Sequence, residues 1–208
     1  NPNAPMKDSG VEWLGEIPDH WEIIKNRYLF KEQNNRSLKG EETHLCMSQK
    51  LGLVPSEQLE VKTLQSESYE GAKLCLSGDL VLNRLKAHLS VFAVASQNGL
   101  VSPDYSVFRL IDPNMKSNFF EYLFKTRPYL TEFNKRVKGI VVGFYRLYSD
   151  DFSDIPSICP PINEQKVILE WIFKKENSFR LTQKSINNEI EKLTELKQIL
   201  IAEAVTGK

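Results

Sequence analysis

Basic and aromatic side chains gather in one segment of the chain, between Lys125 and Tyr148. Six basic residues lie there against one acidic residue, Glu132; they are Lys125, Arg127, Lys135, Arg136, Lys138 and Arg146. Lysine and arginine neutralise DNA phosphates, arginine can bind a guanine edge through two hydrogen bonds, and a neighbouring tyrosine can pack or hydrogen-bond. The segment therefore has the composition of a DNA-facing surface.

A second basic run, residues 83–88, lies where one predicted strand ends and turns toward the next. The predicted DNA-binding residues are Lys50, Arg84, Lys86, His88, Lys135, Arg136, Lys138, Tyr145 and Arg146. A charged helix face is more often simply solvated, and we favour that interpretation for Lys125 and Arg127. Residues 138–146 lie near glycines in a predicted loop, and loops on a rigid scaffold commonly carry recognition.

The sequence lacks the motifs of common catalytic classes. It contains no GxxxxGK[ST] or GxGxxG phosphate-binding loop and no GxSxG nucleophile elbow. His20, His44 and His88 have no partner at metal-ligand spacing, and the three cysteines lie far apart. We therefore predict no catalytic residue, no metal and no cofactor, and we expect reduced thiols in a cytoplasmic protein.

The composition is typical of one globular domain, or of one domain with an extension: 208 residues, 41% hydrophobic and 26% charged. With 27 basic and 27 acidic residues the net charge is zero. That balance excludes a uniformly basic nucleic-acid binder but not a local basic surface. No stretch approaches eighteen consecutive apolar residues, so we predict no transmembrane span. Because the chain does not begin with Met, we expect a piece of a longer protein or a processed chain.

Short strands and helices must position the basic runs. Turn signals separate segments rich in β-branched and aromatic residues at 80–83, 90–94 and 105–110, which predicts a curled sheet. We expect a helix to begin near Asn118, with Glu121 completing a capping box, and Pro128 to break or kink it. A second helical stretch should run to Lys138 and stop at Gly139.

Residues 163–208 carry a different, helical pattern, without Pro or Gly between Glu164 and Thr206. Apolar side chains recur every seven residues, at Ile172, Phe179, Ile186, Leu193 and Leu200. A sustained heptad predicts a coiled-coil seam. Unbroken, the helix would span about 65 Å, against roughly 40 Å for the preceding domain, so its seam needs a partner. The alternative is two shorter helices folded back, with a break at 177–178 or 185–188.

Five strings follow one another along nearly the whole chain. They are KDSGVEWLGEIP at 7–18 with Trp21, GDLVLNRLK at 78–86, GLVSPDYSVFR at 99–109, DIP with PPINEQ between 154 and 165, and LIAEAVTGK at 200–208. Each string is weakly specific, but five in order are specific. Together they resemble a target-recognition domain of type I restriction–modification specificity subunits, followed by its spacer helix.

The resemblance implies an α+β fold, with a small recognition domain over residues 1–162 and a long helix over residues 163–208 that forms a coiled coil. A full subunit of this family has two such units whose helices pack antiparallel. It performs no chemistry itself. It binds a bipartite site in double-stranded DNA, one half per domain, and docks adenine-methyltransferase (M) subunits and, through them, restriction (R) subunits. Because targets differ between members, the predicted DNA-binding residues rest on charge and loop placement rather than on the family motifs.

This sequence holds one unit rather than two, so its seam predicts self-association. A symmetric homodimer would read a split palindrome, since the two-fold symmetry of the protein maps onto the DNA site. One alternative is a coiled-coil adaptor whose front domain binds protein. A less favoured alternative is a stand-alone DNA nuclease or methyltransferase, which would need a metal or cofactor constellation that the sequence does not contain.

Overall fold

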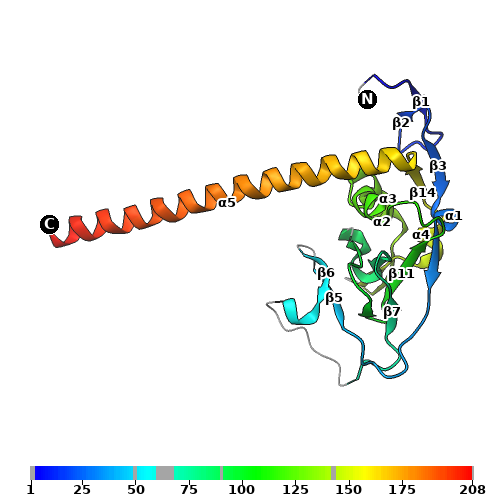
Figure 1. Cartoon of the computed structure of the whole chain (residues 1–208), viewed down its shortest axis with the longest axis horizontal. Coiled ribbons are helices and arrows are strands. Elements are labelled where there is room, and N and C mark those ends of the chain that lie inside the picture. The colour runs from blue at the N-terminus through cyan, green and yellow to red at the C-terminus, as the bar shows by residue number, and fades with distance from the viewer. Residues whose placement is uncertain (1–2, 49–50, 60–67, 90, 142–143, 208) are drawn as a thin grey trace. The chain divides into compact units, whose positions relative to one another are not determined.

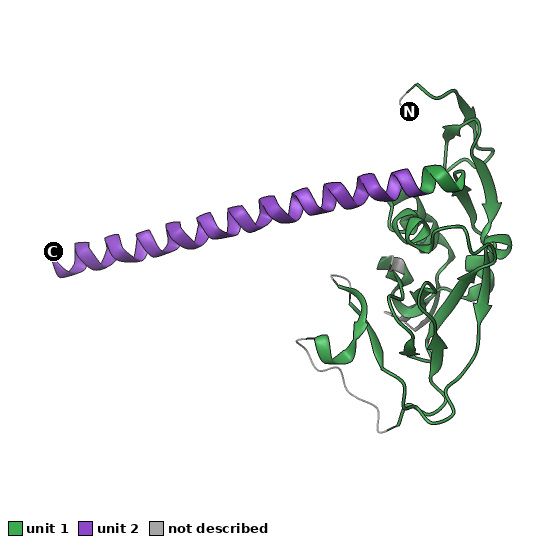
Figure 2. Ribbon diagram, in the orientation of Figure 1, with its two compact units in different colours: residues 1–165 green, residues 166–208 purple. Residues whose placement is uncertain are grey.

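The computed structural model describes residues 3–48, 51–59, 68–89, 91–141 and 144–207. The chain divides into two compact units, residues 1–165 and residues 166–208, which Figure 2 colours separately. The first unit mixes short strands with short helices, and the second is helical. No helix in the described part of the chain is long and apolar enough to cross a membrane.

An antiparallel sheet of four strands, in the order β4-β11-β8-β9, organises the first unit. Figure 1 labels its strand β11. Its strands are β4 (Phe30–Gln33), β11 (Tyr105–Leu110), β8 (Leu80–Asn83) and β9 (Phe92–Val94). The strands predicted at 80–83 and 105–110 are confirmed with these bounds. The third begins at Phe92, and Ser90 lies outside the described residues.

Both faces of this sheet are covered, and β8 is accordingly buried at every position. On one face, Phe30, Phe92 and Phe108 meet aromatic rings from the helices. The Phe108 and Phe152 centroids lie 4.4 Å apart, and those of Phe92 and Phe133 lie 5.1 Å apart. The helices concerned are α2 (Ser117–Phe124), α3 (Arg127–Arg136) and α4 (Ser149–Ser153). An aromatic core therefore fixes these helices to the sheet.

The opposite face carries a separate aliphatic cluster. Val81, Ala93 and Val107 pack there against Leu45 and Leu53 of a hairpin. The hairpin is formed by β5 (Leu45–Ser48) and β6 (Gly52–Pro55) and is followed by η1 (Ser56–Gln58). The antiparallel pair β7 (Lys73–Cys75) and β10 (Gly99–Val101) adds to the same cluster.

Small antiparallel pairs complete the first unit. They are β1 (Met6–Asp8) with β2 (Glu16–Pro18), and β3 (Glu22–Lys25) with β14 (Pro156–Cys159). The single-turn helix α1 (Asn26–Leu29) joins β3 to β4, and the 3₁₀ segment η2 (Arg84–Leu89) follows β8. These ladders bring both ends of the first unit's sequence beside each other, since β3 lies next to β14.

The start of α2 corrects the predicted capping box. The helix begins at Ser117, with Lys116 as its N-cap residue and without a side-chain cap. Glu121 is used elsewhere, because it accepts a hydrogen bond from the Val94 backbone N–H at 2.9 Å. The predicted break is present, but it lies at residues 125–126. Pro128 occupies the first turn of α3, where a missing N–H costs nothing.

The segment after α3 corrects a second prediction. The helix ends at Arg136, and residues from Lys138 onward form a hairpin rather than a loop. Its strands are β12 (Lys138–Val141) and β13 (Phe144–Arg146), which pair antiparallel. The sequence from Lys138 to Tyr148 is rich in isoleucine, valine and aromatic residues, which favour strands. Gly139 therefore lies within a strand instead of ending a helix.

The long C-terminal helix α5 spans Ile162–Thr206 without interruption, which confirms the single helix and excludes the two-helix alternative. Its first turn belongs to the first unit. There Glu164 accepts hydrogen bonds from the Trp21 indole at 2.9 Å and pairs with the His20 ring at 2.6 Å. Gln165 is buried and accepts the backbone N–H of Lys116 at 3.1 Å.

Within the second unit, large apolar side chains of α5 are exposed. They include four of the five predicted seam residues, Phe179, Ile186, Leu193 and Leu200, each at least half exposed. The fifth, Ile172, is partly exposed. On a straight helix a row of residues spaced by seven drifts by about 20° per heptad, and supercoiling with a partner removes this drift.

Candidate nucleic-acid interface

The fold brings the two predicted basic runs together. The segment η2, which carries Arg84 and Lys86, packs against both α3 and β13. The backbone N–H of Leu147, just after β13, donates to the Arg84 carbonyl at 3.1 Å. Residues more than forty positions apart in sequence therefore share one surface region.

Asp104 joins Arg84 to Arg146. Arg146 donates to the Asp104 carboxylate at 2.8 Å, and the Arg84 guanidinium lies 3.8 Å from the same oxygen. Arg84 also donates to the backbone carbonyls of Asp104 and Pro103. The Arg146 Nε is buried and has no hydrogen-bond partner among the described residues. Two guanidinium groups facing one half-exposed carboxylate leave a positive excess at this point.

The cations of α3 and the hairpin are also paired locally. Lys135 and Arg136 both approach Glu132, at 3.8 and 2.8 Å. Lys138 pairs with Asp151 at 2.8 Å, and its ammonium lies 5.6 Å from the centroid of the Tyr148 ring. These pairs hold the long side chains in defined positions, although exposed ion pairs contribute little to stability.

The remaining predicted residues have different surroundings. Lys86 is exposed at a kink in η2 and makes no ion pair with any described residue. Tyr145, on β13 beside Gly139, is 41% exposed. His88 belongs to η2, but its side chain is outside the described part of the chain, and Lys50 lies outside the described residues altogether. Lys125, assigned to a solvated helix face, pairs with Glu121 on its own helix.

The charge balance of this surface is positive. The predicted cations placed here are Arg84, Lys86, Lys135, Arg136, Lys138 and Arg146, and the carboxylates paired with them are Asp104, Glu132 and Asp151. The role of Asp104 was not predicted, because Asp104 lies 20 and 42 positions from its two partners in sequence. Composition shows that charges are present but not which distant residues pair.

A buried lysine lies near this surface and was also not predicted. Lys73, on β7, is almost fully buried, and its ammonium lies 3.7 Å from Glu32. Burial lowers the pKa of Lys73, while the Glu32 carboxylate opposes that shift and the charge of Arg84 adds to it. Glu32 also accepts a hydrogen bond from Ser149 at 2.9 Å. Lys73 therefore ties β7 to β4 and lies too deep to contact DNA.

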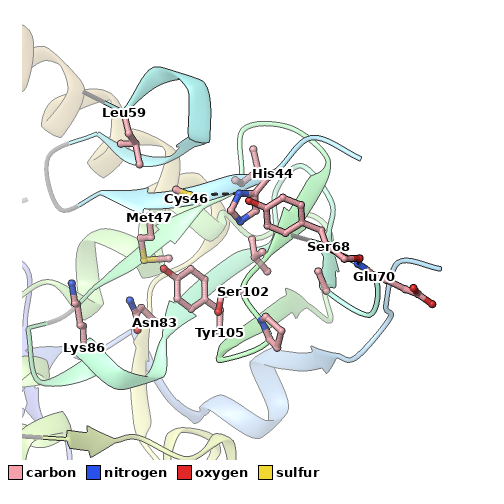
Figure 3. Close-up of a pocket in the computed structure, with 15 residues that line it drawn as sticks. His44, Cys46, Met47, Leu59, Ser68, Glu70, Asn83, Lys86, Ser102 and Tyr105 are labelled. Carbon is pink, nitrogen blue, oxygen red and sulfur yellow. Dashed lines mark hydrogen bonds between the residues drawn. The ribbon is translucent and has the colours of Figure 1, made fainter. Parts of the chain in front are cut away.

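A cavity of about 390 Å³ opens beside η2, under the β5–β6 hairpin. Its wall combines apolar and polar side chains, among them His44, Met47, Tyr69, Asn83, Lys86 and Tyr105. Figure 3 shows the Tyr105 hydroxyl directed toward Asn83 and Met47, with Lys86 alongside. Tyr105 and Asn83 are directly opposite each other on β11 and β8, which explains how they meet.

Among the described residues, the three cysteines form no disulfide with one another. Burial raises the pKa of Cys75 and of Cys159 to about 11, so these two thiols stay protonated. Within the described residues, no three His, Cys, Asp or Glu side chains are grouped so that they could hold a metal ion.

Comparison with known proteins relates this architecture to one family. Residues 18–192 match the family model of the type I restriction modification DNA specificity domain. A structure from work on complex assembly and conformational transition of the type I R-M system matches with a TM-score of 0.65 at 14% identity, over 96% of this chain and 48% of that chain. No curated protein matches in sequence.

Two further solved structures share the fold. The HsdS subunit from Thermoanaerobacter tengcongensis has a TM-score of 0.52 at 12% identity, over 83% of this chain and 40% of that chain. The S subunit of a type I restriction-modification system from M. genitalium has a TM-score of 0.50 at 11% identity, over 76% of this chain and 39% of that chain. The chain therefore spans about half or less of the length of the structures it matches.

Proposed function

Because the chain belongs to the type I restriction modification DNA specificity domain family, we propose that its first unit binds one half of a bipartite site in double-stranded DNA. The family match agrees with the prediction of a specificity subunit without catalysis of its own. The observation that supports the proposal is that η2 packs against both α3 and β13, so the elements that carry these basic residues lie next to one another.

The charges of this surface suit phosphate and base contacts. Lys86 is free to pair with phosphate, and the Arg84–Asp104–Arg146 group keeps one positive charge in excess. Hydrogen bonding by Asp104 and by backbone carbonyls orients both guanidinium groups, which lowers the entropy lost when they bind a base edge or a phosphate. Tyr145, exposed on the adjacent strand, can pack against the sugar or a base.

We further propose that residues 1–162 form the recognition domain and residues 163–208 the spacer helix. The exposed apolar row of α5 supports self-association through a coiled coil, or pairing with an equivalent helix in a longer chain. Docking of M subunits, and of R subunits through them, follows as the proposed role of the assembled protein. We also propose that the protein is located in the cytoplasm, because the DNA that it would bind lies there.

The test is a salt titration of DNA binding by the full chain, measured by fluorescence anisotropy with a labelled duplex. We expect the logarithm of the affinity to fall linearly with the logarithm of salt concentration. Arg146→Ala should weaken binding by roughly 1–3 kcal/mol if this residue contacts a base, and by less with a slope reduced by about 1 if it contacts a phosphate.

The matched control is Arg127→Ala, which removes an exposed arginine from the start of α3 that we assign to solvent. Its affinity and salt slope should equal those of the unaltered chain. Absence of duplex binding, or binding unaffected by salt, would contradict the proposal. Salt-resistant capture of a protein partner instead would favour the coiled-coil adaptor.

A further inference from the structure

We propose that the cavity beside η2 binds a single unpaired nucleobase, an inference that rests on the proposed DNA-binding function. The cavity lies on the sheet face opposite the aromatic core, between the β5–β6 hairpin and the end of β8. Apart from Lys86, none of the described residues proposed to contact the duplex lines this cavity. The size of the cavity, the residues that line it and the basic residues next to it all suit a nucleobase.

The size of the cavity fits one base with part of its sugar. At about 390 Å³ it falls in the lower part of the range of roughly 300–1,000 Å³ that small-ligand sites occupy. Apolar side chains, including Leu45, Met47 and Val101, form part of the wall. A nucleobase has flat apolar faces and a polar edge, so it needs such a wall together with a few fixed hydrogen-bonding groups.

Those hydrogen-bonding groups are present. Asn83 is 93% buried and places a side-chain amide in the wall, where it hydrogen-bonds to the Tyr105 hydroxyl. The edge of a base would meet the Asn83 amide and the Tyr105 hydroxyl, both of which line the cavity.

Aromatic rings supply a stacking surface. The rings of His44 and Tyr69 lie 4.2 Å apart between centroids at an angle of 31°, and both line the cavity. Burial lowers the pKa of His44, so the imidazole is neutral near physiological pH. The neutral rings of His44 and Tyr69 suit an uncharged base, and stacking on aromatic side chains is the usual way in which proteins hold unpaired bases.

The cavity also adjoins the proposed phosphate contacts. Ser102, Pro103 and Tyr105 line it, while the carbonyl of Pro103 and the side chain of Asp104 hold Arg84. Lys86 belongs to both the cavity wall and the basic surface. A base in the cavity would therefore leave its own phosphate beside Arg84 and Lys86. This continuity favours a base presented by a nucleic acid over a neutral metabolite.

The experiment compares two duplexes of identical sequence, one fully paired and one with a single bulged 2-aminopurine, together with free 2-aminopurine riboside. The full chain should bind the bulged duplex about tenfold more tightly than the paired one, with quenched 2-aminopurine fluorescence, because each stacked base adds affinity. Met47→Trp should fill the cavity and remove this preference without changing the affinity for the paired duplex.

Met6→Trp is the matched control, since Met6 is an exposed methionine on β1 outside the cavity wall, and it should keep the preference. Tyr105→Phe is a second test. It keeps the ring but removes the hydroxyl, so the preference for the bulged duplex should fall several-fold. Binding of the riboside, blocked by Met47→Trp and without any bulge preference, would support a nucleobase site that serves a free nucleoside.

Equal affinity for both duplexes and no binding of the riboside would overturn the inference. A bulge preference that survives both cavity variants would overturn it as well. Either result, obtained with intact binding of the paired duplex, leaves the proposed function standing. Loss of binding to every duplex is instead a failure of the proposed function.

Discussion

Asp104 controls how freely the two arginines of the proposed interface can meet DNA. Its carboxylate lies 2.8 Å from Arg146 and 3.8 Å from Arg84, and it is half exposed. A DNA phosphate that binds either guanidinium must compete with this carboxylate. Asp104 therefore orders the arginines and also lowers the charge that they offer to DNA.

Replacing Asp104 with asparagine tests this competition at the residue scale. Asp104→Asn keeps a hydrogen-bond acceptor but removes the negative charge, so DNA affinity at low salt should rise several-fold and the salt slope should steepen by about 1. Anisotropy titrations measure both. Asp154→Asn is the control, because Asp154 pairs with Lys25 and Arg27 instead. Weaker DNA binding by Asp104→Asn would show that the ordering of the two arginines by Asp104 favours binding more than its competition with phosphate opposes it.

The sequence located the cations of the interface but not their geometry. Arg84, Lys138 and Arg146 could be selected because basic residues near aromatic and glycine residues are typical of DNA-facing surfaces. Their pairing with Asp104 and Asp151 depends on which distant segments the sheet brings together, and local composition carries no signal for that. The cavity was missed for the same reason, because Asn83 and Tyr105 meet only through the β8–β11 register.

At the scale of elements, the first turn of α5 is held by residues from the start of the chain. Glu164 accepts the Trp21 indole N–H and pairs with His20. Hydrogen bonding to Glu164 is the largest influence on the His20 pKa and raises it above its ordinary value of 6.5, while burial acts in the opposite direction. Trp21 first, and then His20, lower the pKa of Glu164.

These shifts predict a pH dependence with a definite sign. Because its pKa is raised on folding, His20 stabilises the fold fully below pH 6.5, and this contribution is lost as pH rises through the raised pKa. The contribution of Glu164 is present above pH 4.5 and is lost as pH falls through its lowered pKa. The contact is therefore strongest between these limits.

His20→Gln should accordingly lower the thermal midpoint more at about pH 6 than at about pH 8.5, because the contribution of His20 is lost as pH rises through its raised pKa. Differential scanning calorimetry at both values measures the difference. His44→Gln is the comparison, since burial lowers the pKa of His44 and its pH dependence should have the opposite sign. A His20→Gln effect that is independent of pH would contradict the ion-pair assignment.

Elements with a strong local pattern were predicted well, and those decided by tertiary contacts were not. The strands at 80–83 and 105–110 and the uninterrupted helix α5 follow directly from β-branched content and from the absence of Pro and Gly. The capping box at Asn118 failed because Glu121 binds the backbone of β9 instead. The loop predicted after α3 proved to be a hairpin, in which Gly139 lies within β12 and pairs with Tyr145 of β13.

At the scale of the whole molecule, the exposed row on α5 predicts association. Leu193→Glu places a charge in the middle of the proposed seam, where desolvation without a partner is unfavourable. It should convert a dimer into monomers, as measured by sedimentation velocity at micromolar concentration. Gln198→Glu, about 140° around the helix, adds the same charge and should leave the dimer intact. An unchanged distribution for Leu193→Glu would count against the seam.

Selection from a random duplex library, with the chain purified together with an adenine-methyltransferase subunit, tests DNA recognition by the first unit. We expect enrichment of a short motif that recurs as an inverted pair at fixed spacing, because two recognition units related by two-fold symmetry would be separated by paired helices. Enrichment of a single half-motif would support DNA recognition but contradict the symmetric homodimer. No enriched motif, despite stable assembly with the partner, would contradict the assignment of the first unit as a DNA-recognition domain.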